Sequence, residues 1–193
     1  MVARGYSLIE LLAVLTLALL LCGVGMPTLL AARDDIRADG AASFLVGELR
    51  LARMEALRRN VQVAVRFEVD GDDYLLAFYL DGNGNGVRSA DIASGVDALL
   101  RPRERLRQSF PGVGFGFESD VPDLDGASSA ENPNPIRFGS SRMVSFSPTG
   151  TSSSGTVYLR GRGHRQLAVR VLGGTGRIRT WLFNFGIHQW CSR

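Results

Sequence analysis

The spacing of hydrophobic residues changes after Ala32, and the first part of the chain predicts a membrane segment. Residues 11–32 carry no charge, and those from Leu11 to Leu21 are almost wholly aliphatic. A helix rises about 1.5 Å per residue, so this run reaches roughly 33 Å and can cross a hydrocarbon core of about 30 Å. The run therefore favours a membrane-spanning helix over a buried core helix.

Beyond Ala32 the apolar positions recur at intervals of three and four residues, which is the spacing of one helix face. This stripe consists of six positions: Ala38, Ala41, Leu45, Leu49, Ala52 and Ala56. Asn60 ends the pattern and suits a left-handed position after a helix. We therefore expect one helix from about Tyr6 to Arg59, whose second half packs on a folded domain.

The rest of the chain alternates apolar and polar residues with a period of two, which is typical of half-buried strands. Clusters of Gly, Ser, Asp and Pro separate these stretches and favour antiparallel pairing. The fold class we predict is α+β, a long N-terminal helix packed on a mainly antiparallel sheet. The expected strands are Val61–Phe67, Tyr74–Leu80, Val113–Phe117, Met143–Phe146, Thr156–Arg160, Gln166–Leu172 and Arg177–Phe183.

The start of the chain carries a specific motif. Residues 4–12 read Arg-Gly-Tyr-Ser-Leu-Ile-Glu-Leu-Leu. This motif resembles the cleavage and methylation site of type IV prepilins and type II secretion pseudopilins. The resemblance implies that a prepilin peptidase removes a leader of residues 1–5 by cutting between Gly5 and Tyr6. Tyr6, where most relatives have phenylalanine, would then be N-methylated, and residues 6–32 would span the membrane.

Glu10 stands at the beginning of the apolar run. A carboxylate at the membrane centre costs about 2.5–3.5 kcal/mol, and less near the interface. Glu10 is either hydrated among the headgroups or used in assembly, and the resemblance implies that it pairs with the N-terminal amine of a neighbouring subunit. Pro27 falls where such helices often carry a kinking proline, which removes one main-chain hydrogen bond.

Two further segments are similar to the GspH/FimT group of minor pseudopilins and minor type IV pilins. The sequence of residues 49–60 is LRLARMEALRRN, and residues 176–179 read Gly-Arg-Ile-Arg. The resemblance implies a single-pass inner-membrane protein with a cytoplasmic N-terminus, and places the helix end and sheet domain, residues 33–193, in the periplasm. Its partners would be other pseudopilins or pilins of a filament.

The first interpretation of function is a structural minor pseudopilin of the type II secretion system. The alternative is a minor type IV pilin that binds DNA in natural transformation. Charge bears on this choice, since residues 132–193 contain nine arginines and no acid, whereas the net charge of the whole chain is only +3. Arg177 and Arg179 are candidate phosphate contacts, although alternate arginines also occur on the solvated face of a strand.

Residues 81–91 resemble the front of a calcium loop, with oxygen ligands at regular positions and glycine at the sixth. The ligands would be Asp81, Asn83, Asn85, the carbonyl of Val87, Ser89 and Asp91. The bidentate acid expected at the twelfth position is replaced by Ile92. The alternative is a Gly/Asn-rich turn between strands, because these residues tolerate positive φ.

Catalytic chemistry has little support, so we expect no enzyme and no cofactor apart from the calcium alternative. His164 and His188 lack a nearby cysteine nucleophile or metal-ligand spacing, and a chain without lysine excludes P-loop and serine–lysine mechanisms. The aromatic segment Trp181–Trp190 either caps the core between helix and sheet or contacts a neighbouring subunit.

Overall fold

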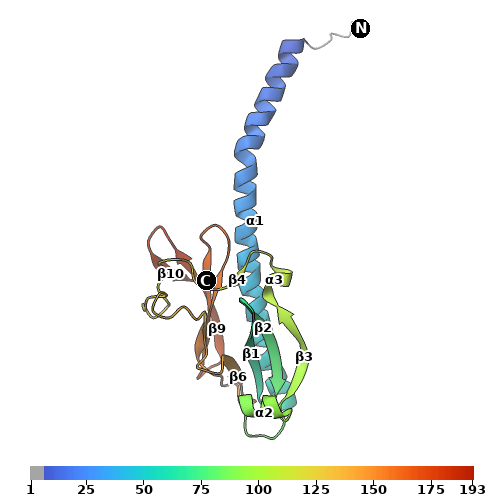
Figure 1. The fold of residues 1–193 in the computed structure, drawn as a ribbon, viewed down its shortest axis with the longest axis vertical. Coiled ribbons are helices and arrows are strands. Elements are labelled where there is room, and N and C mark those ends of the chain that lie inside the picture. Colours follow the sequence, from blue (N-terminus) through green and yellow to red (C-terminus); the bar gives the residue numbers. More distant parts are fainter. Residues whose placement is uncertain (1–6) are drawn as a thin grey trace.

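The long helix predicted from the sequence is present. The computed structural model describes residues 7–193, and its first element is helix α1, Leu8–Arg59. The Ser7 side chain accepts a hydrogen bond from the Glu10 N–H (3.3 Å) and caps the start of the helix. Asn60 follows in the left-handed conformation, with a φ of 54°, and ends it as expected. α1 rises far out of the folded domain (Figure 1).

The second half of α1 packs against the domain through the stripe of small and branched residues. All six predicted positions, from Ala38 to Ala56, are completely inaccessible to solvent. Alanine keeps this face flat, so strands approach the helix axis closely. Gly161 illustrates the fit, because a Cβ placed there would lie only 2.9 Å from the Cβ of Ala38.

The strands form two antiparallel sheets rather than the single sheet that was expected. The first sheet has the order β3-β2-β1-β6, with bounds Ala98–Arg105, Asp73–Leu80, Val63–Asp70 and Met143–Phe146. The second has the order β10-β9-β8-β7-β4, and β5 also pairs with β7. Its bounds are Gln189–Ser192, Arg177–Asn184, Gln166–Leu172, Gly155–Arg160, Gly114–Phe115 and Ile136–Arg137 for β5.

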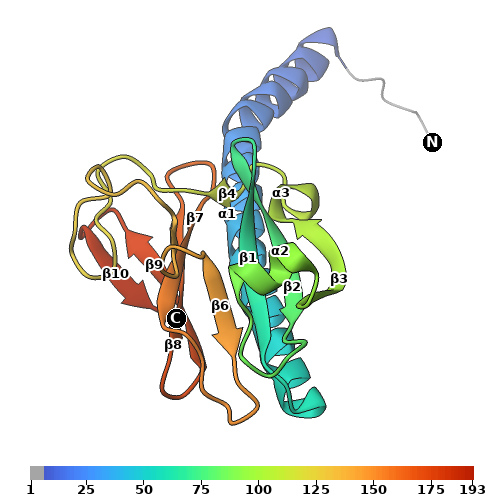
Figure 2. The same ribbon diagram turned by 60° about the horizontal axis from the view of Figure 1, so that its bottom comes forward.

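The two sheets lie on different sides of the lower half of α1 (Figure 2). Two short helices, α2 (Ser89–Ser94) and α3 (Leu106–Ser109), flank β3 in the chain. The sheets also touch each other, because the ring of Phe67 in β1 lies 5.8 Å from that of Phe115 and 6.2 Å from that of Phe138. The helix stripe and both sheets therefore share one core.

The expected strand at Val113–Phe117 is wrong in extent, since only Gly114 and Phe115 pair, with β7. β3 was not predicted, because its alternation is hidden by arginines and by Pro102. It is an edge strand whose Arg103 and Arg105 pair with acids of β1, Glu68 and Asp70. Edge strands are commonly charged and proline-containing, which blocks pairing with other chains.

Truncation of Leu49 should reveal how much the stripe contributes. We expect Leu49→Ala to destabilise the domain by about 2–5 kcal/mol, because the residue is fully buried between α1 and the sheets. The matched control is Leu51→Ala, whose side chain is 38% exposed and should lose less than about 1 kcal/mol. Denaturant unfolding of the full chain in detergent measures both; equal losses would contradict the packing described.

Candidate assembly and interaction sites

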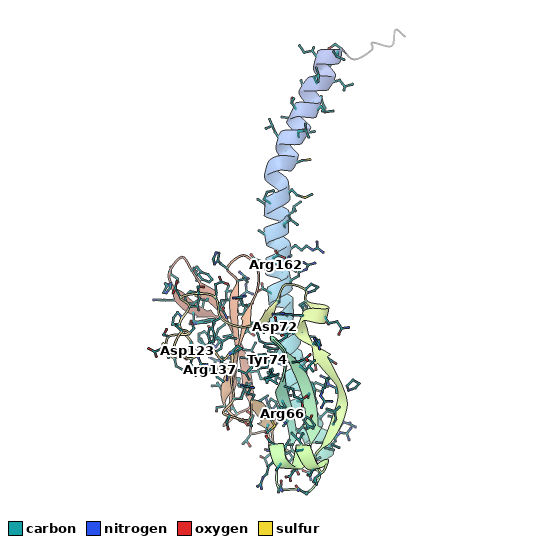
Figure 3. The ribbon with its side chains drawn as sticks, in the orientation of Figure 1. Arg66, Asp72, Tyr74, Asp123, Arg137 and Arg162 are labelled. Carbon is teal, nitrogen blue, oxygen red and sulfur yellow. The ribbon has the colours of Figure 1, made fainter. Side chains whose placement is uncertain are left out.

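The first half of α1 is an exposed apolar surface. Its most apolar window of 18 residues has a mean hydropathy of 2.5 and no buried residue. Large side chains project from all around the helix with no neighbour from the domain (Figure 3). Leu8 and Ile9, for example, are 81% and 76% exposed. By length and composition this helix can cross a membrane, and its surface requires lipid or other apolar partners.

Glu10 lies in the first turn of α1 with its side chain exposed. Carboxylates are favoured at this end of a helix by the helix dipole. Gly5 and Tyr6, the predicted cleavage and methylation positions, lie outside the described residues. The pairing of Glu10 with a neighbour's amine therefore stays a prediction.

Pro27 lies within the continuous helix. It has no N–H to donate to the carbonyl of Gly23, so one rung of the helix ladder is missing. The helix axis changes direction along its exposed part (Figure 2). The contribution of Pro27 to that bend stays a prediction.

An ion-pair cluster lies where α1 leaves the domain, and sequence reasoning did not find it. Arg165, in the turn between β7 and β8, donates to both carboxylate oxygens of Asp39, each at 2.9 Å. Arg193 reaches the same carboxylate at 2.8 Å, and Asp35 lies 3.7 Å from Arg165. Because Asp39 is on the helix, this cluster ties α1 to the second sheet at the exit point.

The Asp39 carboxylate has a lowered pKa. Burial alone would raise the pKa of Asp39, but the hydrogen bonds from Arg193 and Arg165 outweigh burial and lower it. A carboxyl whose pKa is lower in the folded state stabilises the fold above its unfolded pKa. That contribution is lost as the pH falls through the folded pKa.

Arg177 and Arg179 contribute to a basic groove along the edge of β9 that lies next to α1. The groove has a volume of about 600 Å³. Five arginines line it: Arg50 and Arg53 from α1, Arg177 and Arg179 from β9, and Arg193. Arg53 also donates to the carbonyl oxygen of Gly176 (3.3 Å), which connects the helix to the turn before β9. Of these five, only Arg177 and Arg179 were predicted from the sequence, as phosphate contacts. The i, i+3 spacing of Arg50 and Arg53 was the available signal for the two helix arginines.

The Asp81 loop follows β2 and is organised by its own backbone. The Asp81 carboxylate, 6% exposed, accepts hydrogen bonds from the N–H groups of Asn83, Gly84 and Gly86 at 3.2, 2.8 and 2.9 Å. Gly84 and Gly86 both adopt positive φ, 79° and 89°. These features are those of the Gly/Asn-rich turn.

A second buried carboxylate completes this loop. Asp97, 2% exposed, accepts from the N–H groups of Gly82 and Arg88, and the Gln62 side chain accepts from Val87. Ser89 and Asp91 lie in α2 rather than in the loop. Across residues 7–193, no three His, Cys, Asp or Glu side chains are grouped to hold a metal. Calcium binding by the predicted ligands remains an untested prediction.

The C-terminal aromatic residues pack on the face of the second sheet that points away from α1. Tyr158 lies 4.3 Å from Phe117 and 5.9 Å from Trp190 between ring centres, and Phe183 lies 5.3 Å from Trp190. The Trp190 indole donates to the carbonyl oxygen of Pro122 (3.0 Å). The cluster therefore holds the long loop after β4, and it does not cap the core between helix and sheet.

A long, half-exposed N-terminal helix carried by a small antiparallel α+β domain defines a pilin-like protein. A family model described as "Type II transport protein GspH" matches residues 41–175. This match covers more than half of the 193 residues, so the chain belongs to the GspH family, whose members are structural subunits rather than enzymes.

Individual relatives are similar over part or most of the chain. The pilin-like protein PilA1 of Thermus thermophilus is 38% identical over 86 residues, 44% of this chain and 53% of PilA1; the match thus spans about half the length of that curated relative. Two structures of the minor pseudopilin EpsH of the Vibrio cholerae type 2 secretion system show 17% and 15% identity, each with a TM-score of 0.46. They cover 75% and 76% of this chain and 95% and 94% of EpsH.

Removal of the Asp39 charge should have a pH-dependent effect. We expect Asp39→Asn to destabilise the full chain at pH 7 by on the order of 1 kcal/mol, a modest value because the carboxylate is partly solvent-screened. The loss should shrink as the pH falls through the lowered pKa of Asp39, because the carboxyl of the parent protein then becomes protonated as well. Thermal unfolding in detergent from pH 7 to pH 3 measures this.

Asp72→Asn is the matched control, because the Asp72 side chain is 91% exposed and its ion pair with Arg107 is a long one, 3.4 Å. It should change stability little at any pH. An equal loss for Asp39→Asn at pH 7 and pH 3 would contradict a contribution from the ionised carboxylate.

Proposed function

We propose that the protein is a structural minor pseudopilin that assembles into the periplasmic filament of a type II secretion system. The observation that carries this proposal is the match of residues 41–175 to the GspH family. The exposed apolar half of α1 supports it, because exposure of such a surface to water is unfavourable. Packed helices of neighbouring subunits would cover it in a filament.

Before assembly the subunit is held in the inner membrane by a single pass of α1. The N-terminus is cytoplasmic and the sheet domain is periplasmic. The prepilin peptidase cuts between Gly5 and Tyr6, and Tyr6 is then methylated. The new amine lies near Glu10 of a neighbour, and their pairing removes the cost of two separate charges in an apolar surrounding.

A second candidate function is a minor type IV pilin that takes up DNA. Two observations favour it: Arg177 and Arg179 lie together in a basic groove, and a relative is named as a pilin-like protein. Deletion of the gene in its host distinguishes the two candidates. Loss of protein secretion with normal transformation supports the first, and the reverse supports the second.

Neutralisation of Glu10 tests the assembly step. We expect Glu10→Ala to leave peptidase cleavage intact but to reduce incorporation into filaments by at least about tenfold, since a lost ion pair in an apolar surrounding exceeds 1.4 kcal/mol. Intact mass of membrane-extracted protein reports cleavage, and immunoblotting of sheared filaments reports incorporation.

Glu131→Ala is the control for a lost carboxylate, because Glu131 is exposed on the loop after β4. It should assemble normally. Normal incorporation of Glu10→Ala would contradict the proposed ion pair, and an uncut chain in cells that contain the peptidase would contradict the proposed cleavage between Gly5 and Tyr6.

A further inference from the structure

The basic groove carries an excess of charge that the rest of the domain does not balance. Other arginines nearby are paired, as Arg165 and Arg193 are with Asp39 and Arg170 is with Asp125. Within residues 7–193, Arg50, Arg53, Arg177 and Arg179 form no ion pair. Four unpaired guanidinium groups around one groove repel one another, and a bound anionic partner would reduce this repulsion.

The groove also exposes a strand edge. Thr180 in β9 accepts a hydrogen bond at its carbonyl from the N–H of Arg193 (3.0 Å), so its main chain faces the β10 side. Main-chain groups alternate in direction along a strand, so those of Ile178 face the same side. β10 pairs with β9 only as far as Trp181, opposite Ser192. Among residues 7–193, no strand pairs with the N–H and C=O groups of Ile178 on this side, and they are presented to the groove.

The arginines lie on both faces of this open edge. Arg179 is opposite Arg170 in the register of β8 and β9, which places it on the face that points away from α1. Arg177 shares that face, whereas the Ile178 side chain packs against the helix–sheet core. Arg50 and Arg53 approach from α1 on the other side. An extended chain laid along the edge would have arginines on both of its faces.

We infer that the groove binds an extended acidic polypeptide segment contributed by a neighbouring subunit of the filament. Its main chain would pair with Ile178, and its carboxylates would meet the four unpaired arginines. Strand addition of this kind combines main-chain affinity with side-chain specificity. The remaining lining residues are aliphatic, small or hydroxylic, namely Val46, Gly176, Ile178, Thr180 and Ser192.

This lining favours a polypeptide over single-stranded DNA. Sites for single-stranded DNA combine basic residues with aromatic side chains on which bases stack, whereas none of the described residues that line this groove is aromatic. A nucleic acid also offers no regular donor–acceptor pair to complement the main chain of Ile178. Only the identity of the partner as a filament subunit rests on the proposed function; the binding chemistry does not.

The test is fluorescence anisotropy of labelled peptides added to the full chain in detergent. The probe is a short Glu–Thr peptide of repeated Glu-Glu-Thr-Thr, which places carboxylates on both faces of an extended chain. Its two comparison peptides have either alternate amides N-methylated or Lys in place of Glu. We expect the Glu–Thr peptide to bind and both comparison peptides to bind at least about tenfold more weakly, since each removes main-chain pairing or charge complementarity.

Substitutions locate the site. Arg177→Ala combined with Arg179→Ala should weaken Glu–Thr binding by about tenfold or more, and Arg88→Ala, an exposed arginine in the Asp81 loop, should not change it. Ile178→Pro removes the edge N–H while leaving the N–H groups that face β8, so it should also weaken binding. Circular dichroism confirms that each variant is folded, and the arginine pair remains informative if the proline variant is not.

Equal binding of the N-methylated peptide would overturn strand pairing. Unchanged binding by the arginine variant would overturn the site, and tighter binding of a single-stranded oligonucleotide would overturn the polypeptide assignment. Filament incorporation of the parent chain is measured separately. If the parent chain does not enter filaments, the proposed function is wrong. The peptide measurement still tests the binding site independently.

Discussion

One uninterrupted helix has to satisfy two different surroundings, and the rest of the structure depends on that constraint. A helix bonds its own main-chain groups, so α1 can pass from an apolar phase into a protein core without a break. Only its side chains need to change. They are apolar on every face before Ala32, and apolar on a single stripe from Ala38 to Ala56, all of whose predicted positions are fully buried. The two sheets pack on that stripe and exclude water from it.

Two sheets rather than one follow from the same requirement. A single sheet covers one side of a helix, whereas here β1 and β6 contact α1 from the first sheet, and β7, β8 and β9 contact it from the second. The charges then separate by position. Asp39 is neutralised by Arg165 and Arg193 at the exit of the helix, while the α1 and β9 arginines of the basic groove form no ion pair within residues 7–193.

Local patterns in the sequence predicted the helix and most of the strands. Asn60 as the helix end and the bounds of Met143–Phe146 and Gln166–Leu172 agree with the structure because each depends on neighbouring residues alone. Pairing into two sheets, and the groove itself, depend on residues far apart in the chain. Arg53 and Gly176, for example, are separated by 123 positions, and no spacing rule connects them. The edge strand β3 was missed because its protective charges erase the alternation that would identify it.

The long buried stripe has a mechanical consequence for a filament subunit. From Ala38 to Ala56 the helix packs along the domain over roughly 27 Å, at about 1.5 Å per residue. A pull along α1 therefore loads this interface in shear, and many small contacts share the force at once. The domain can be dragged with its helix without any single contact carrying the whole load, and damage to one contact weakens the joint by degrees.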